Sequence, residues 1–522
     1  MNSHDSRISG PFSLSRRALV GGAAAGGLAG LLAHQRRGLP GASAQASGQS
    51  VGDLRLALGF DFPARIDQLK DHQLLPMGML ECLTRQTPDN VLEPWLAESI
   101  TNTDPSTWRV VLRDATFWDG SPVTADDVIN SIRLSYDASP DNKGLISPDT
   151  VMTAVDAKTI DFVTPSPSGF FPHALALSSF GVFKLAADGT GSIMTGPYKP
   201  TRLVVDSQLD LVPHAGHWAG PPPIANITVT YVPDPNTRLL ALQSGDVDML
   251  YNFPAEAIDG FGPDIEAPII PSGRVDLINL NVNRLPFSDR AVREAMALGI
   301  DRDELNTVGL NGHGTPAVGM FPPSTGYQTL PLQGTDPTRA AQLLDDAGWP
   351  MGSDGVRARD GARLSFTLYS YPGRAELTPY AVTMQSQLQP LGFDITVTEV
   401  QNVADVIKTG DWDAAMKSNN TIVTGDPLYE FNRLFLTGGG DNVGQYSNPQ
   451  LDAIVDQMRT ELDPAKEQDL SMQVQQIVKD DVPVVFLVAL PITTAYRKGK
   501  VIGYVPNPND GYLITTALSV KA

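Results

Sequence analysis

The stretch RLSFTLYSYPGRAELTPYAVTMQSQLQPLGFDITVTEVQNVADVIKTGDWDAAMKSNN, residues 363–420, decides the fold class. It alternates three strand-like segments (363–370, 394–400 and 412–420) with two helix-like segments (377–392 and 403–410). Strands that alternate with crossover helices form a parallel sheet covered on both faces. We therefore expect an α/β protein.

Polar residues follow the strands of this region. Ligands of open α/β sheets bind beyond the carboxyl ends of the strands. The third strand ends at Asn420 and runs into TIVTGDPLYEFNRLF, residues 421–435. Asn420, Asp426 and Tyr429 are therefore candidate ligand contacts.

A second candidate edge lies in LLALQSGDVDMLYNF, residues 239–253. The pattern predicts a helix that ends at Gly245 and a strand over 247–250. Tyr251, Asn252 and Phe253 would then stand at the strand end. The first strand, predicted over 54–59, is followed by Phe60 and Asp61, and Asp61 joins the candidates. We expect the strand ends near 251–253 and near 420 to face one gap from two α/β lobes, which would close on a ligand like a clamp.

Four helix starts follow one rule. Asp234-Pro235, Asp336-Pro337, Asn448-Pro449 and Asp463-Pro464 each place a capping side chain before a proline at the first helical position. Thr124 is expected to cap a further helix, with Asp126 and Asp127 in its first turn.

The N-terminal 46 residues have the pattern of a twin-arginine export signal. Arg16 and Arg17 precede a short, glycine-rich apolar run, and small residues ending at Ala44 or Ala46 offer cleavage sites. An uncleaved N-terminal anchor is the alternative. We expect an exported, periplasmic protein.

Net charge and cysteine content bear on nucleic-acid binding and on disulfide formation. Residues 1–46 hold five arginines and one aspartate, so their removal changes the formal charge from −20 to −24. A nucleic-acid partner is therefore not expected. The one cysteine, Cys82, excludes an intramolecular disulfide and is expected to be a small buried residue.

The sequence makes no positive case for an enzyme, a cofactor or a metal site. It has no P-loop and no HExxH pattern, and GQSVG at 48–52 lacks the strand-to-helix context of a nucleophile elbow. His214 and His217 could hold a metal if that segment were helical, but Gly216 and the prolines at 221–223 favour a loop of surface or hydrogen-bonded histidines.

Several segments resemble the extracytoplasmic solute-binding proteins of ABC importers, family 5, which bind peptides, dipeptides or nickel. The segments are LEPWLAESITN, WRVVLRDATFWDGSPVTADDVINS, TGPYKP, VTYVPDPNTRLLALQSGDVDMLYN, LINLNVNRLPFSDRAVREAMALGIDRDEL, DPTRAAQLLDDAGW and QQIVKDDVPVVFL. They cover nearly the whole mature chain in family order.

The resemblance implies a two-lobed periplasmic-binding-protein clamshell (type II-like) with mixed sheets and an inserted accessory lobe. Lobe one would comprise 47–88, 195–274 and 491–522, the accessory lobe 89–194, and lobe three 275–490. Two strands near 275–281 and 484–495 would cross between the lobes. The protein would act as a monomer, capture a small polar solute by hinge closure and deliver it to a membrane permease.

The resemblance leaves the solute open. The aspartate that grips a peptide's amino group in peptide-binding members falls here on Val423, so either Asp426 takes that role or the solute has no amine. The arginine that nickel-binding members aim at the metal chelate falls near Ser179 or Phe180. Opines, siderophore-like chelates, glutathione and sugars remain alternatives.

The resemblance also bears on the contacts and on rival functions. Tyr251 and Asn252 match a pocket-lining pair of peptide binders. The rival functions are an exported peptide hydrolase and a peptide-loaded receptor or chaperone without an import role.

Overall fold

The computed structural model describes residues 50–521 except 63, 71, 72, 139, 190, 422 and 510. The predicted export signal at 1–46 lies outside the described residues. Within them, none of the helices combines the length and the apolar character needed to span a bilayer.

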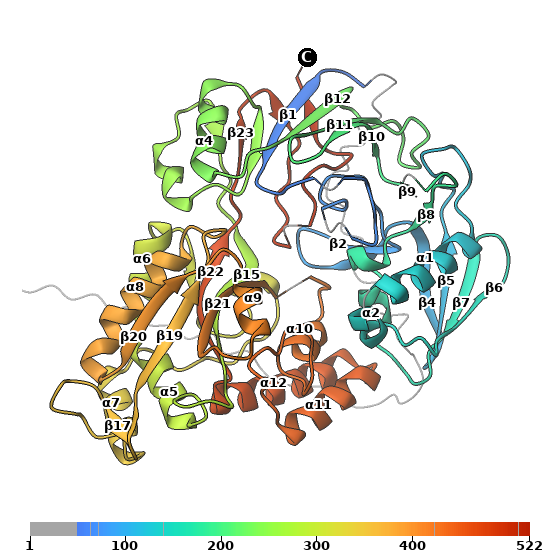
Figure 1. Cartoon of the computed structure of the whole chain (residues 1–522). Helices are drawn as coiled ribbons and strands as arrows, with labels where there is room; N and C mark the ends of the chain where they lie inside the picture. The colour runs from blue at the N-terminus through green and yellow to red at the C-terminus, as the bar shows by residue number, and fades with distance from the viewer. Residues whose placement is uncertain are drawn as a thin grey trace, which may run out of the picture. The chain divides into compact units, whose positions relative to one another are not determined.

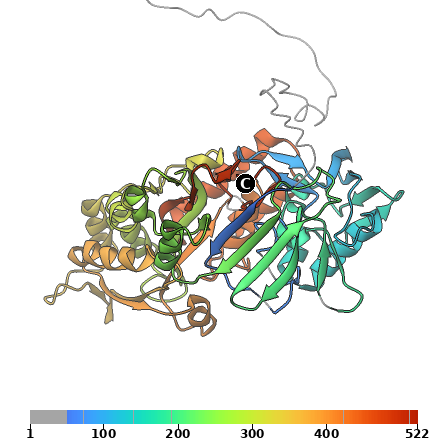
Figure 2. The same ribbon diagram turned by 90° about the horizontal axis from the view of Figure 1, so that it is seen from above.

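The first large sheet contains seven strands and is built around β1 (Figures 1 and 2). β1 pairs in parallel with β12 and with β13, and β13 pairs antiparallel with β23. In sheet order the strands are β10 (Tyr198–Val204), β11 (Gln208–Pro213), β12 (Asn226–Tyr231), β1 (Asp53–Leu58), β13 (Met249–Tyr251), β23 (Thr494–Arg497) and β14 (Ile265–Glu266).

β1 is buried on both faces because its side chains alternate. Leu54 and Leu56 join one apolar cluster, while Ala57 packs with Leu242 of helix α4 (Pro235–Ser244) in another. The predicted strand over 54–59 is therefore confirmed within a residue at each end. The second strand begins two residues later than predicted, so Tyr251 lies inside β13.

The second large sheet contains six strands and is mixed. β19 pairs in parallel with β20 and β21, which confirms the parallel arrangement expected from 363–420, whereas β15 pairs antiparallel with β21 and β22. Its order is β16 (Thr315–Pro316), β22 (Val484–Pro491), β15 (Pro271–Leu280), β21 (Ala414–Asn420), β19 (Ser365–Ser370) and β20 (Asp394–Glu399).

Helices contribute to two large cores that include this sheet. One core contains side chains of α5 (Arg290–Gly299), α6 (Arg302–Leu310), α7 (Pro337–Asp346) and α8 (Leu377–Leu388). The other contains side chains of α10 (Pro427–Leu434), α11 (Pro449–Thr460) and α12 (Pro464–Asp481). α9 (Val403–Lys408) connects β20 to β21. Every residue of β22 is buried, because the strand contributes to both cores.

The predicted helix starts are confirmed. The side chains of Asp234, Asp336, Asn448 and Asp463 each accept a hydrogen bond from a backbone amide of the first turn. Thr124 and Asp127 bond reciprocally at the start of α1 (Ala125–Ala138): Thr124 N donates to Asp127 Oδ2 at 2.9 Å, and Asp127 N donates to Thr124 Oγ1 at 3.3 Å.

In the sequence, a four-stranded antiparallel sheet lies between β1 and β10, which both belong to the seven-stranded sheet. Its order is β4 (Ala97–Asp104), β5 (Thr107–Leu112), β7 (Thr159–Val163) and β6 (Val151–Ala154). α2 (Pro140–Leu145) and the short α3 (Phe171–Ala174) belong to the same region. Smaller hairpins pair β2 (Thr84–Gln86) with β3 (Leu92–Pro94), β8 (Phe183–Leu185) with β9 (Ser192–Met194), β17 (Ala358–Arg359) with β18 (Ala362–Arg363), and β24 (Val501–Ile502) with β25 (Ser519–Val520).

The chain passes between the two large sheets at residues 267–270 and 492–493. The two passages touch, because Ile492 N donates a hydrogen bond to Ile270 O at 2.8 Å. The second passage lies within the predicted range, but the first lies upstream of the predicted 275–281. Residues 275–280 of that segment already lie within β15, paired residue by residue with β21.

Candidate functional site

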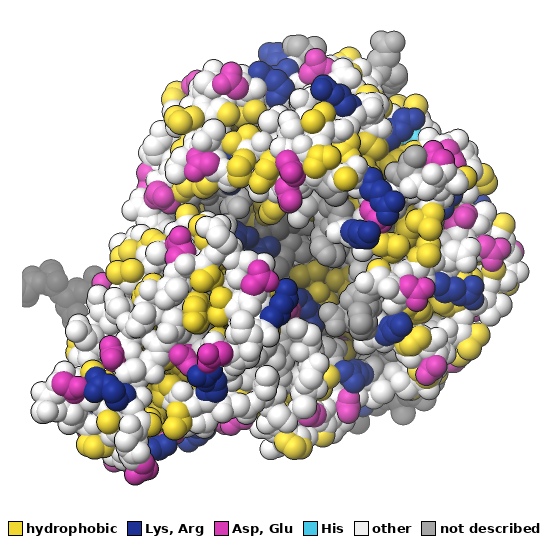
Figure 3. Space-filling view, in the orientation of Figure 1, with side chains coloured by type: hydrophobic (Ala, Val, Ile, Leu, Met, Phe, Trp, Pro, Cys, Tyr) yellow, Lys and Arg dark blue, Asp and Glu magenta, His cyan; other side chains and the backbone are white. Residues whose placement is uncertain are grey.

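A cavity of about 280 Å³, here called cavity A, is lined by both large sheets. Leu58, Phe60 and Tyr251 line it from the carboxyl ends of β1 and β13, and Arg274 and Asn420 line it from β15 and β21. The phenyl ring of Phe60 and the phenol of Tyr251 lie 5.9 Å apart, centroid to centroid. A hollow is visible between these parts of the chain in the space-filling view (Figure 3).

Hydrogen bonds join the six-stranded sheet to the C-terminal segment at this cavity, and one of them links β15, where Gly273 N donates to Pro508 O at 2.9 Å. Asn420 Nδ2 donates to Asn509 O at 2.6 Å, and Asn509 also lines cavity A. Ile514, a few residues further on, is buried in the core of the seven-stranded sheet. The walls of cavity A therefore come from segments far apart in the sequence.

A second cavity of about 270 Å³, here called cavity B, shares Phe60 with cavity A. Its walls include Asn252 and Phe253 after β13, Arg374 and Glu376 between β19 and α8, and Thr493 of the second passage. Tyr251 and Asn252, neighbours in the chain, thus line different cavities.

A buried arginine holds the turn that presents these two residues. Arg238 of α4 is 2% exposed and donates through Nε to Asn252 O at 3.1 Å and through Nη1 to Val232 O at 2.6 Å. Gly59 makes room for it, because a Cβ there would lie 2.6 Å from Arg238 Nη1. Asn252 has a φ of +61°, a conformation that asparagine tolerates better than most residues.

The charges beside cavity B are close together and buried to different degrees. Asp276 on β15 is fully buried, and burial followed by the charge of Glu376 raises its pKa well above the ordinary value. Burial by itself would lower the pKa of Arg374, but the neighbouring Glu376, Tyr251 and Asp276 outweigh it and raise that pKa.

A groove of about 560 Å³ continues from cavity A, with which it shares Ser178 and Val423. Tyr429 lines this groove rather than cavity A, and the guanidinium of Arg433 lies 4.7 Å from the centre of its ring. Val423, the position of the amine-gripping aspartate in peptide-binding relatives, lines both spaces with an apolar side chain. Ser179, the position compared with the arginine of nickel binders, lines the groove, and Phe180 is buried.

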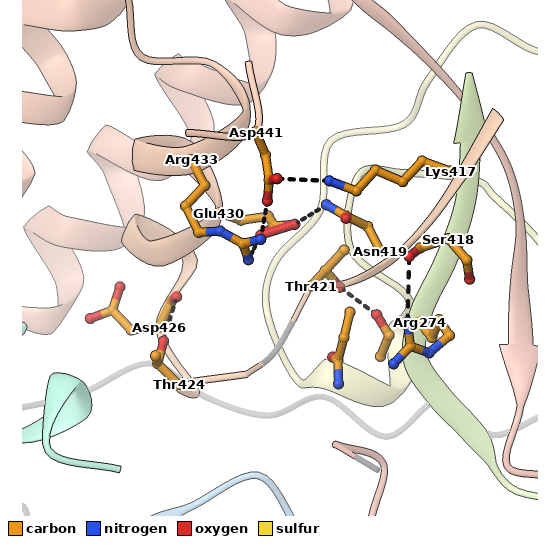
Figure 4. A network of polar contacts seen from close by, with 12 residues as sticks. Arg274, Lys417, Ser418, Asn419, Thr421, Thr424, Asp426, Glu430, Arg433 and Asp441 are labelled. Carbon is orange, nitrogen blue, oxygen red and sulfur yellow. Dashed lines mark hydrogen bonds and ion pairs between the residues drawn. The ribbon is translucent and has the colours of Figure 1, made fainter. Parts of the chain in front are cut away.

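Arg433 also lines the groove and belongs to a network of polar contacts (Figure 4). Asp441 pairs with Arg433 and with Lys417 Nζ, the latter at 2.8 Å. Asn419 Nδ2 donates to Glu430 Oε1 at 2.7 Å. Burial, with a contribution from Arg433, lowers the pKa of Lys417 to about 8. The network joins the end of β21 to α10.

Asp426 lies at the N-terminus of α10 and lines neither cavity. It is 4% exposed, and its Oδ1 accepts a hydrogen bond from Leu428 N at 2.7 Å, so it caps the helix. Glu467 of α12 lies against it. Burial, followed by the charge of Asp426, raises the pKa of Glu467 to about 9.

The structure therefore separates the seven predicted contacts. Tyr251 and Asn420 line cavity A, Asn252 and Phe253 line cavity B, and Tyr429 lines the adjoining groove. Asp61 is exposed and Asp426 is a helix cap. Sequence reasoning missed Arg374, Glu376 and Asn509. The rule that candidate contacts follow strand ends would have found the first two if it had been applied to the loop after the strand predicted over 363–370.

The two histidines singled out from sequence are buried, at 4% and 5% exposure. His217 Nε2 lies 3.1 Å from Glu81 Oε1, which also accepts a hydrogen bond from Trp218 Nε1 at 2.9 Å. Of the two interpretations, the hydrogen-bonded histidine is the one observed for His217. Among the described residues, no group of three or more His, Cys, Asp or Glu side chains is arranged to hold a metal ion.

Comparison with known families decides what kind of protein carries these cavities. Residues 91–442 match the profile described as "Bacterial extracellular solute-binding proteins, family 5 Middle". The chain belongs to this family. The resemblance to the solute-binding proteins of ABC importers is thus confirmed, and members of the family are extracellular or periplasmic binding proteins.

Curated relatives of this family 5 chain include the glutathione-binding protein GsiB of Escherichia coli strain K12. The two are 29% identical over 445 residues, which cover 80% of this chain and 84% of GsiB. GsiB of Salmonella typhi is 28% identical over 447 residues, with the same coverage.

Solved structures show the same fold. NikA of Staphylococcus aureus, in complex with Ni(L-His)2, has a TM-score of 0.80 at 23% identity, covering 90% of this chain and 100% of NikA. The oligopeptide-binding protein AppA of Bacillus subtilis, in complex with a nonapeptide, has a TM-score of 0.76 at 22% identity, covering 91% and 100%. The expected α/β fold of a two-lobed periplasmic binding protein is confirmed.

Proposed function

We propose that this family 5 protein captures a small polar, peptide-like solute in cavity A by closure of two lobes and presents it to the permease of an ABC importer. The observation that supports this proposal best is the double lining of cavity A. A solute in contact with Tyr251 on one side and Asn420 on the other binds the closed state better than the open state.

The lobes of this proposal keep the predicted accessory lobe at 89–194 and move the other boundaries to the two passages: lobe one would comprise 47–88, 195–266 and 494–522, and lobe three 271–491. The two passages at 267–270 and 492–493 would serve as the hinge, because they are short and hydrogen-bonded to each other. We further propose export by the twin-arginine signal, delivery as a monomer, and contacts from Tyr251, Asn252, Phe253 and Asn420.

Glutathione and short peptides are the first solutes to test, because one relative is named a glutathione-binding protein and one structural neighbour an oligopeptide-binding protein. A nickel chelate, an opine or another non-peptide solute is the alternative within the same family. Val423 favours a solute whose amine, if it has one, is not bound at that position, since burying an unpaired ammonium would cost several kcal/mol.

Small-angle scattering with and without solute tests the proposal. Saturating glutathione or a short peptide should reduce the radius of gyration, and Tyr251→Ala should abolish that reduction without unfolding the protein. If none of these solutes alters the scattering or the melting temperature, the peptide-like assignment fails. If mass spectrometry shows the solute cleaved after incubation, the chain is instead an exported hydrolase.

A further inference from the structure

A pocket of about 410 Å³, here called the Glu81 pocket, lies beside cavity A, with which it shares Leu75 and Tyr512. The residues that line it come from 75–95, 197–219 and 505–517. A ligand held by these residues would not bridge to the six-stranded sheet, so it is not the solute of the proposed function. The pocket opens at the surface, because Val505 and Thr516 in its lining are exposed.

The carboxylate of Glu81 is fully buried in the wall of this pocket and receives hydrogen bonds on one oxygen. Its Oε1 accepts from His217 Nε2 at 3.1 Å and from Trp218 Nε1 at 2.9 Å. Within the described residues, its Oε2 has no hydrogen-bond partner, although that atom is buried. Burying a carboxylate oxygen without a partner is costly, and a ligand can offset that cost.

The two donors do not balance the charge of Glu81. Ala219 N donates a hydrogen bond to His217 Nδ1 at 3.3 Å, so Nδ1 carries no proton, and the ring proton is on Nε2, which faces Glu81. The imidazole is therefore neutral, as is the indole of Trp218. Among the described residues, no lysine or arginine lies within ion-pair distance of Glu81. The pocket thus holds a buried negative charge that a bound cation would neutralise.

Aromatic rings surround this charge. Three aromatic residues line the pocket: Trp95, Trp218 and Tyr512. The rings of Trp95 and Tyr512 meet edge to face at 5.7 Å between centroids. Arg85 also lines the pocket, but Glu93 neutralises it, because Arg85 Nε donates to Glu93 Oε1 at 2.8 Å. Aromatic faces and a carboxylate together are the groups that recognise an organic cation.

We propose that the Glu81 pocket binds an alkylammonium group, with its carbon chain against the aromatic rings and its charge held by Glu81. An anion would be repelled by Glu81, and a neutral guest would leave the buried charge unpaired. The group belongs either to a free amine or to a lysine side chain of a partner protein. The inference does not rest on the proposed function, because this pocket can be filled whether or not the lobes close.

The full chain is titrated at neutral pH with n-butylamine, its uncharged analogue 1-butanol and the anion butyrate, and the indole Nε1–H resonance of Trp218 is followed by NMR. That resonance should shift saturably with n-butylamine, whose affinity should exceed that of 1-butanol by about tenfold or more, and butyrate should not bind. Glu81→Gln keeps the shape of the side chain and an acceptor for Trp218. It should remove the preference for the amine, whereas the exposed control Glu98→Gln should keep it.

A change at the mouth guards against a Glu81 variant that fails to fold. Thr516→Lys places a tethered alkylammonium beside the pocket and should weaken n-butylamine by about tenfold, whereas the uncharged Thr516→Gln should not. Equal affinities of the wild type for n-butylamine and 1-butanol would overturn the inference, as would an unchanged preference in folded Glu81→Gln. Such a result leaves the proposed function intact, since it concerns neither cavity A nor closure.

One further probe identifies the source of the ammonium group. Nα-acetyl-L-lysine methylamide carries the side chain of a lysine within a peptide. If it binds as tightly as n-butylamine, the mouth admits a lysine of a partner protein. If it binds about tenfold more weakly or worse, the pocket takes a free amine.

Discussion

Arg238 Nε donates a hydrogen bond to the carbonyl oxygen of Asn252 at 3.1 Å, and this contact joins α4 to the end of β13. The same guanidinium also bonds the carbonyls of Val232 and Pro233. Because Asn252 follows Tyr251 directly, the arginine positions one residue of each cavity. A residue that lines cavity B but not cavity A can thus influence the geometry of both cavities.

Replacement of Arg238 by methionine should destabilise the protein and weaken solute binding. The change leaves buried carbonyl oxygens without donors, which lowers the free energy of unfolding by about 1–3 kcal/mol. Gly59→Ala should act in the same direction, because its Cβ would collide with the guanidinium. Urea denaturation measures the effect, with Arg339→Met as the exposed control. An unchanged midpoint in Arg238→Met would contradict this role.

Asp426 offers a direct choice between two roles. As a helix cap, Asp426→Ala should cost about 1 kcal/mol, whereas Asp426→Asn keeps the cap and should be nearly neutral. As an amine-binding residue, Asp426→Asn should weaken the binding of a free-amine dipeptide by about tenfold or more while the melting temperature stays constant. Calorimetry and thermal denaturation of the same two variants decide between the roles.

Glu467 should make stability fall as the pH rises. Its pKa is near 4.5 in the unfolded chain and about 9 in the folded protein, so between these values the folded state holds a proton that the unfolded state has lost. The stabilising effect is complete below pH 4.5 and disappears as the pH passes 9. Glu467→Gln should flatten the decline of melting temperature between pH 5 and 9, scanned at about one-unit intervals.

The control for this prediction is Glu98→Gln, an exposed glutamate of β4. General charge repulsion in an acidic protein lowers stability with rising pH in both variants. Parallel pH curves for Glu467→Gln and Glu98→Gln would show that Glu467 does not hold the proton.

Val423→Asp should create the amine site that the sequence lacks. Val423 lines cavity A, so a carboxylate there can pair with the α-ammonium of a peptide. Affinity for a dipeptide should rise by about tenfold relative to its N-acetylated form. The uncharged Val423→Asn should show no such preference. If the aspartate variant binds both forms equally, the position does not face the solute's amine.

Local features were predictable because they depend on neighbours in the chain. A capping side chain before a proline satisfies amides within one turn, so the four helix starts follow from sequence. The parallel order of β19, β20 and β21 follows from the alternation of strands and crossover helices. The candidate residues at strand ends, Tyr251 and Asn420, reach cavity A for the same reason: parallel strands end at one edge.

The exceptions concern side chains whose role depends on a distant partner. Asp61 lies three residues after the end of β1, yet it is exposed. Asp426 looked like a ligand-binding carboxylate, but its own helix amides lie nearer than either cavity. Nothing local distinguishes Arg374 and Glu376 from other charged loop residues.

The sequence by itself determined the family, the α/β class and the boundaries of most elements, since these follow from periodicity, capping and specific motifs. Only the tertiary structure decided which charges meet in cavity B and which segments close cavity A. The physical reason is that burial and pairing are set by segments far apart in the sequence, such as Asn420 and Asn509, which are 89 residues apart. Asn420 of the six-stranded sheet meets Asn509 of the C-terminal segment because the chain passes between the two large sheets twice.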